Sequence, residues 1–281
     1  MRGSSAALLL GVMIVAVPAL GQDALGPFDG QPGCCGDATP TGSSYMLCDH
    51  WGGSWCDAEK SPSNGDDDLM CWAATAANVL EWNGLGKVAG MVTSDQMFTY
   101  FQDHWTDQGG LMEYGWEWWF DGTNNSQGWS GWSQVDVPGG GFYPARDFYG
   151  DYYHETNADS AALSAVDNYL HAGYGVGLGV YKPGGGHAIT CWGYNYDPAD
   201  EDDYFGIWVT DSDDSKHDST PPDRLRYYEV ELTGGKWHIQ DFYGTDDWYI
   251  GTVQALDVPE PVTLVLLAAA ALPLLRRRRR L

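Results

Sequence analysis

The apolar residues first recur at helical spacing and then, toward the end of the chain, at alternating spacing. Helical spacing predicts helices over residues 69–83, 94–105 and 159–172. The first of these has small apolar residues on one face and Asp68 as its expected N-cap. Small side chains on a helix face let a sheet approach closely.

Alternation predicts strands in the second half of the chain. They are expected over residues 176–180, 187–196, 204–211, 226–232, 236–242 and 249–256. Residues 109–150 are rich in Trp, Gly and Tyr without a clear period, and we expect a long ordered loop region or short strands there. Helices followed by an antiparallel set of strands predict an α+β fold.

The N-terminal segment has the layout of a secretory signal peptide. Arg2 precedes an apolar run, and a small-residue site ends at Gly21, so we expect cleavage after residues 1–21 and export from the cytoplasm. A retained N-terminal anchor is the alternative, although the apolar run is short for a membrane span.

The C-terminal segment has three parts in a specific order. Val258-Pro259-Glu260-Pro261 is followed by an apolar stretch and then by arginines 276–280. Residues 258–281 resemble the PEP-CTERM sorting signal of Gram-negative bacteria, which implies processing by an exosortase-type enzyme. The arginines would hold this end in the cytoplasm, so membrane contact is expected only through the tail. The expected location is the periplasm, cell surface or exterior, and a permanent tail anchor is the alternative.

The charge of the chain argues against negatively charged partners. The formal net charge is −25 at pH 7, and removal of the basic residues in both end segments would make the remainder more acidic. Such a surface repels nucleic acid and anionic lipid. The aromatic fraction of 14% is sufficient for a folded core and excludes disorder of the whole chain.

Four of the six cysteines lie in residues 22–57, a segment rich in Gly and Asp. We interpret this segment as an extension that precedes the main folded domain over 58–256. Export permits disulfides, and two are expected among Cys34, Cys35, Cys48 and Cys56. A metal site is the weaker alternative, because the spacing lacks paired C-x2-C knuckles.

Cys71 and His187 are the candidate nucleophile and base. Cys71 lies in the first turn of the predicted 69–83 helix, where free N–H groups and the helix dipole favour a thiolate. His187 starts a strand directly after three glycines, which leaves room for a substrate. Taken singly, each residue is more often structural than catalytic.

The expected hairpin brings a carboxylate to His187. If the turn over 197–203 is symmetric, His187 faces position 212, beside Asp211 and within one residue of Asp213. A carboxylate there is expected to accept the Nδ1 proton and leave Nε2 to act on the thiol.

Three blocks of sequence resemble a known family. Residues 67–82 around Cys71, residues 187–193 and residues 208–213 are similar to the nucleophile, histidine and aspartate segments of the Mac/IdeS family. These are streptococcal cysteine endopeptidases that cleave immunoglobulin G. The resemblance implies a papain-like fold with Cys71, His187 and Asp211 as the triad, a protein or peptide substrate, and no cofactor or metal. Nothing in the blocks carries over the immunoglobulin substrate.

The resemblance also assigns Lys60, which matches a family lysine that helps to form the oxyanion hole. Asp213 has two interpretations: a residue that holds or tunes His187, or a solvated acid at a strand end. Two functions from other classes stay open. A Cys-His-Asp site also suits a transglutaminase-like acyltransferase, and the acidic segments 197–203 and 211–218 with the aromatic-rich region suit a non-catalytic Ca²⁺- or polysaccharide-binding surface protein.

Overall fold

The computed structural model describes residues 42–61, 65–122, 138–157, 159–214 and 223–257. The predicted signal peptide, the sorting segment 258–281, Cys34 and Cys35 therefore lie outside the described residues. Within the described ranges, no helix is long and apolar enough to cross a membrane.

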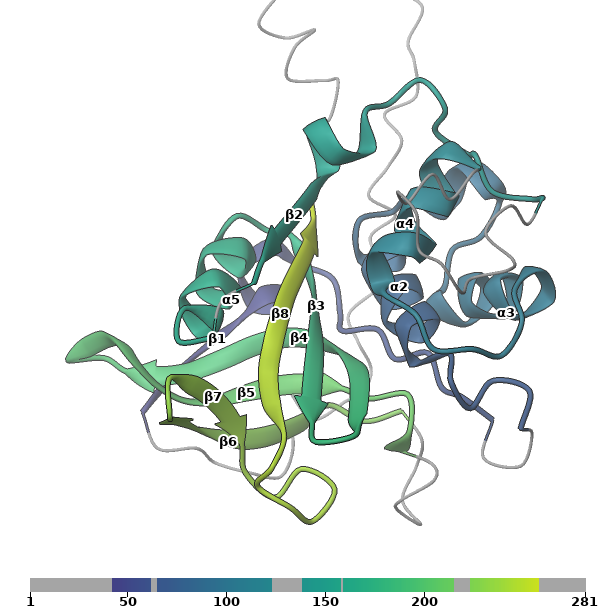
Figure 1. Cartoon of the computed structure of the whole chain (residues 1–281). Helices are drawn as coiled ribbons and strands as arrows, with labels where there is room; N and C mark the ends of the chain where they lie inside the picture. Colours follow the sequence, from purple (N-terminus) through teal and green to yellow (C-terminus); the bar gives the residue numbers. More distant parts are fainter. Residues whose placement is uncertain (1–41, 62–64, 123–137, 158, 215–222, 258–281) are drawn as a thin grey trace, which may run out of the picture. The chain divides into compact units, whose positions relative to one another are not determined.

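The strands form one antiparallel sheet, and six of them close into a barrel (Figure 1). Each barrel strand pairs with the next, and β4 also pairs with β5, so the barrel has no open edge among these six. Two short strands extend the sheet: β1 (Ser43–Met46) pairs with β4, and β2 (Tyr153–Thr156) pairs with β8. The barrel strands are β3 (Gly175–Lys182), β4 (Gly185–Asp197), β5 (Asp200–Thr210), β6 (Arg226–Thr233), β7 (Lys236–Ile239) and β8 (Tyr249–Leu256).

The expected papain-like fold, with N-terminal helices followed by an antiparallel sheet, is wrong. The sheet closes into a six-stranded barrel, and among the described residues its first strand precedes the helices. Strand positions were well predicted, but alternation within a strand does not report which strands pair. Closure depends on register shifts, such as those at Gly179/Val180 and at Cys191/Gly193, that strengthen the coiling of the sheet.

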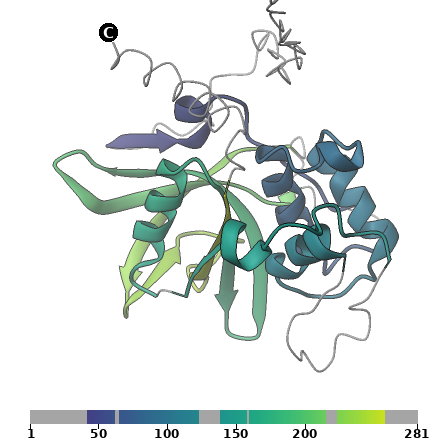
Figure 2. The same ribbon diagram turned by 90° about the horizontal axis from the view of Figure 1, so that it is seen from above.

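The helices lie mostly outside the strand-rich part of the sequence. All three predicted helices form, each within a few residues of its expected bounds. Figure 2 shows the same ribbon seen from above. The predicted N-cap is wrong: α2 starts at Cys71 with Met70 as N-cap, because the preceding residues form a turn closed by the Met70 N–H and the Asp67 carbonyl. The helices are α1 (Leu47–Trp51), α2 (Cys71–Trp82), α3 (Ser94–His104), α4 (Met112–Asp121) and α5 (Ala162–His171), with short 3₁₀ and π turns at Lys87–Ala89 and Phe148–Tyr152.

Helix α4 replaces the loop or short strands expected within 109–150. Its tryptophans Trp116, Trp118 and Trp119 are fully buried, so the helix has apolar groups almost all around and gives no simple amphipathic period. Gly115 lets it approach α2, since a Cβ there would lie 2.9 Å from the ring of Trp72. Trp129 and Trp132 lie outside the described residues.

Two hydrophobic clusters organise the structure. One fills the barrel and the space under α5, with residues such as Val176, Ile189 and Ile250. The other lies among α2, α3 and α4 and is mainly aromatic. Helix α2 joins the two, because it contacts β3 and β4 as well as α3 and α4.

The expected disulfide arrangement is wrong for at least one cysteine. Cys56 is a buried free thiol, whereas two disulfides among four cysteines require every one of them to be paired. Its Sγ lies 3.9 Å from the carbonyl oxygen of Ser54, and burial raises its pKa well above the ordinary value. This thiol is therefore a packed, unreactive group.

Candidate active site

Cys71 is the first residue of α2. At this position its backbone N–H has no partner within the helix, and the partial positive charge of the helix terminus lies at the thiol. The helix is fixed to the barrel by Asn78, whose Nδ2 donates to Oγ1 of Thr190 on β4 at 2.9 Å and whose Oδ1 accepts from the Ala58 N–H at 2.8 Å. These buried bonds set the position of Cys71 relative to β4.

His187 and Asp211 come from the two strands of one hairpin. Thr190 of β4 pairs with Thr210 of β5, so His187 lies just before that pair and Asp211 follows β5 directly. His187 Nε2 lies 2.6 Å from Oδ1 of Asp211, and both side chains are buried. The predicted proximity is confirmed, but the predicted ring nitrogen is wrong. Asp211 holds Nε2, which leaves Nδ1 for the thiol.

Tyr243 completes the support of Asp211. Its hydroxyl donates to Oδ2 of Asp211 at 2.6 Å and lies 3.2 Å from His187 Nε2. The Asp213 N–H donates to Oδ1 of Asp211 at 3.0 Å. Tyr243 has a φ of 52°, an unusual conformation for a residue with a side chain, and this points its ring into the site. The carboxylate is thus held by three separate donors.

The pKa values of the triad favour a thiolate–imidazolium pair. Burial raises the Cys71 pKa, but the charge of His187, its hydrogen bond to Cys71, and Lys60 outweigh burial, so the net pKa is below the ordinary value. Burial lowers the His187 pKa, yet Asp211 and Cys71 raise it well above the ordinary value. Burial likewise raises the Asp211 pKa, but His187 and Tyr243 lower it to about 2. Asp211 therefore stays ionised.

Lys60 and Asp213 form a second buried pair beside the triad. Lys60 Nζ lies 2.9 Å from Asp213 and donates to the carbonyl oxygen of Asp68 at 2.7 Å. Lys60 is placed by its own backbone N–H, which donates to the Ser212 carbonyl at 3.0 Å. Asp213 Oδ2 is 3.9 Å from Nδ1 of His187. Asp213 is therefore part of the site and not a solvated strand-end acid.

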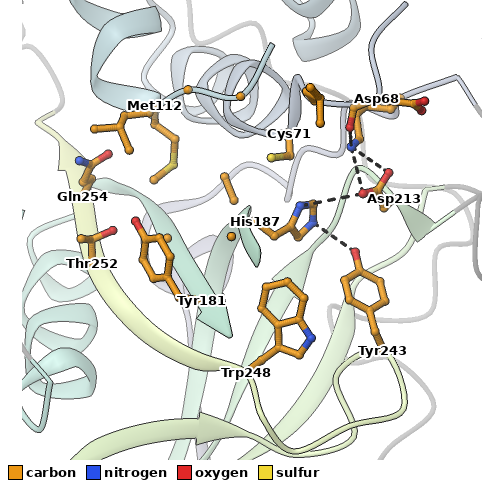
Figure 3. A pocket seen from close by; sticks show the side chains of 18 residues that line it. Asp68, Cys71, Met112, Tyr181, His187, Asp213, Tyr243, Trp248, Thr252 and Gln254 are labelled. Carbon is orange, nitrogen blue, oxygen red and sulfur yellow. Dashed lines mark hydrogen bonds and ion pairs between the residues drawn. The ribbon is translucent and has the colours of Figure 1, made fainter. Parts of the chain in front are cut away.

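These groups open onto a cavity of about 460 Å³ (Figure 3). Its lining combines the charged residues around Cys71 with residues from the loop before α4 and from β3 and β8. Figure 3 shows Cys71 and His187 facing each other in the middle of this cavity. Among the residues that line it are Lys60, Cys71, Met112, His187, Asp213 and Gln254. A substrate in the cavity would reach the thiol and the imidazole together.

Two groups of side chains have the spacing of metal ligands. His187, Asp211 and Asp213 form one group, and Asp57, Glu59 and Asp214 form the other, with possible ligand atoms within 4.8 Å of one another. Protein cations already contact both: Lys60 binds Asp213, and Arg226 binds Asp214. The first group therefore suits proton transfer better than metal binding, and the expected absence of a cofactor stays a prediction.

Five residues of this site were predicted from the sequence, and others were not. The structure brings together Cys71, His187, Asp211, Lys60 and Asp213, as predicted. It adds Tyr243, which reaches Asp211 from the segment between β7 and β8, and residues that only line the cavity, such as Met112 and Gln254. No sequence pattern indicates Tyr243, because its role depends on a left-handed backbone in an irregular segment.

Comparison of the chain with protein-family models and with curated proteins gives no match. The resemblance to the Mac/IdeS family and to the PEP-CTERM signal therefore stays a prediction from the motifs alone.

Proposed function

We propose that this protein is a cysteine peptidase that hydrolyses peptide bonds through Cys71, His187 and Asp211. The observation that carries the proposal is that Cys71 and His187 face each other on one cavity, with His187 Nε2 held 2.6 Å from Oδ1 of Asp211. A nucleophile beside a base that a third group orients is the arrangement that acyl transfer requires. The lowered Cys71 pKa supports the same conclusion.

The residues would act in sequence. The Cys71 thiolate attacks the peptide carbonyl, and the protonated His187 gives its Nδ1 proton to the leaving amine, which leaves a thioester. Water, deprotonated by His187, then hydrolyses the thioester and releases the acid and the thiol. The Cys71 N–H and the Lys60 ammonium lie beside the thiol and would stabilise the oxyanion.

The binding-module alternative is less well supported. Asp211 and Asp213 are held by His187, Tyr243 and Lys60, so they are poor ligands for Ca²⁺. The tryptophans of α4 are buried and cannot stack on a polysaccharide. In the exposed β4–β5 turn, Asp197 Oδ1 already accepts the Ala199 N–H, so this oxygen is a poor Ca²⁺ ligand as well.

The proposal includes an exported location and processing by an exosortase-type enzyme, which rest on the motifs of residues 1–21 and 258–281. It also includes a protein or peptide substrate, which rests on the three sequence blocks around Cys71, His187 and Asp211. The transglutaminase-like alternative uses the same first step and differs only in whether water or an amine accepts the acyl group. A test must therefore separate thiolate formation from the identity of the acceptor.

The first experiment is alkylation of Cys71 by iodoacetamide across pH, on the wild type and on His187→Ala. Reaction well below the ~8.5 of a free thiol, lost in His187→Ala, would support the pair. Reaction only near that value in both proteins would remove the chemical basis of a peptidase. Incubation with a peptide library, with and without an added primary amine, then identifies the acceptor by mass spectrometry: new termini indicate hydrolysis, and amine adducts indicate acyl transfer.

A further inference from the structure

The cavity has two chemically different ends. Figure 3 shows Asp68 and Asp213 at one end, Gln254 and Thr252 at the other, and Cys71 with His187 between them. The charged lining residues are Lys60, Asp68, His187 and Asp213. Figure 3 shows Asp68, His187 and Asp213 away from the Gln254 end, and Lys60 lies 2.9 Å from Asp213. A substrate group that enters the Gln254 end therefore meets neutral side chains.

Gln254 presents a buried acceptor there. Gln254 is only 2% exposed, and its Nε2 donates to the Tyr153 hydroxyl at 2.9 Å. Oε1 is buried and has no hydrogen-bond partner among the described residues. A buried amide oxygen without a donor is unfavourable, and a ligand that supplies the donor removes this cost.

The neighbouring bonds fix which end of the amide faces the cavity. The Tyr153 hydroxyl donates its proton to Oε2 of Glu155 at 3.0 Å, and burial raises the Tyr153 pKa, so this tyrosine stays protonated. With its proton used, the hydroxyl can only accept from Gln254. One N–H of Gln254 is thus used by Tyr153, which places the amide nitrogen on that side, and Figure 3 shows the oxygen on the cavity side.

Two hydroxyl groups and a glycine shape the space beside Gln254. A Cβ on Gly179 would collide with Oγ1 of Thr252 and lie 3.0 Å from the hydroxyl of Tyr181, so glycine at this position lets both hydroxyls approach the backbone of β3. Met112 lines the same end, and its flexible thioether side chain can move as a ligand enters. The space thus offers one fixed acceptor and two hydroxyls that can donate.

We propose that this end of the cavity is a specificity subsite for an uncharged substrate side chain that ends in a hydrogen-bond donor, and that a primary amide, as in glutamine or asparagine, is the preferred group. The amide N–H would bond to Gln254 Oε1, and the amide oxygen would accept from the hydroxyl of Thr252 or Tyr181. The inference rests on the proposed function, because it concerns the substrate of the same thiol.

The test is covalent labelling of Cys71 by peptidyl acyloxymethyl ketones that differ in one side chain. Glutamine is compared with methionine, which is apolar and of similar length, and with glutamate, which is similar in shape but has no donor when ionised. Each of the three side chains is placed in turn at the peptide positions nearest the electrophilic carbon of the reagent. At one position the glutamine reagent should label the wild type at least about tenfold faster than both others.

Gln254→Met should lose this preference and label faster with the methionine reagent. Gln240→Met is the matched control, because Gln240 lies outside the cavity lining, and it should label like the wild type. Equal labelling by all three reagents at every position, while iodoacetamide still reacts at low pH, would overturn the subsite and leave the peptidase proposal intact. Loss of iodoacetamide reactivity at low pH would overturn both. The wild-type comparison decides the question even if a variant does not fold.

Discussion

Nε2 of His187 lies 2.6 Å from Oδ1 of Asp211, and the carboxylate thus holds the ring nitrogen that faces away from the thiol. This bond fixes the imidazole orientation and supplies the negative charge that raises the His187 pKa. The Cys71 pKa is lowered in turn by the charged imidazole. The state of the thiol is therefore controlled by a carboxylate that does not touch it.

Asp211→Asn tests this control. Without the carboxylate charge, the His187 pKa falls and the Cys71 pKa rises, so alkylation of Cys71 should shift to higher pH. Peptide hydrolysis should fall on the order of 10²- to 10⁴-fold. In the wild type, hydrolysis should decline on the acid side as the Cys71 thiolate is protonated, and on the alkaline side as His187 loses its proton above its raised pKa. An unchanged alkylation profile in the variant would contradict the assignment of Asp211.

Tyr243→Phe removes a single hydrogen bond from Asp211. Oδ2 is then a buried acceptor with one donor fewer, which should lower the free energy of unfolding by about 1–3 kcal/mol. The kcat should fall roughly tenfold because the triad is less well fixed. Denaturant unfolding and peptide hydrolysis measure the two effects. Tyr149→Phe is the control, since it removes a Tyr–carboxylate bond to Glu113 at an exposed position, and its hydrolysis rate should equal that of the wild type.

Lys60→Met removes the buried ammonium group that pairs with the Asp213 carboxylate. Because the Lys60 side chain is only 1% exposed, the loss should cost about 3 kcal/mol in the free energy of unfolding. The double variant Lys60→Met/Asp213→Asn should recover part of this stability but not the activity, as the cation beside Cys71 is still missing. Recovery of both in the double variant would show that Lys60 acts only by balancing Asp213.

Gly115→Ala tests the contact between α4 and α2. A Cβ at this position would lie 2.9 Å from the Trp72 ring and 3.4 Å from Ala76, two groups that are rigidly packed. The variant should therefore be destabilised by about 1–3 kcal/mol, even though alanine favours a helix interior. Gly109→Ala, where no atom lies within 4 Å of the new Cβ, is the control for thermal unfolding. Equal stability of the two variants would mean that the aromatic side chains around Gly115 rearrange to accommodate the added Cβ.

Local sequence patterns predicted the structural features that depend on residues close together in the chain. The spacing across the β4–β5 turn placed Asp211 beside His187, because hairpin register follows from residue numbers when the turn is short. The ring nitrogen could not be predicted, since it depends on where α2 places Cys71. Barrel closure and Tyr243 depend on long-range pairing and on one left-handed residue. Helix α4 was missed because its buried tryptophans hide the helical period.

The bond between Asn78 and Thr190 has a consequence for the whole site. Cys71 belongs to a helix of the aromatic cluster, whereas His187 and Asp211 belong to the barrel, so the thiol and its base are built on different cores. The reactivity of one sulfur atom therefore reports whether these cores are docked. An early stage of denaturation that only loosens α2 would raise the pKa of Cys71 toward that of a free thiol while leaving the barrel, and most of the circular dichroism of its strands, in place.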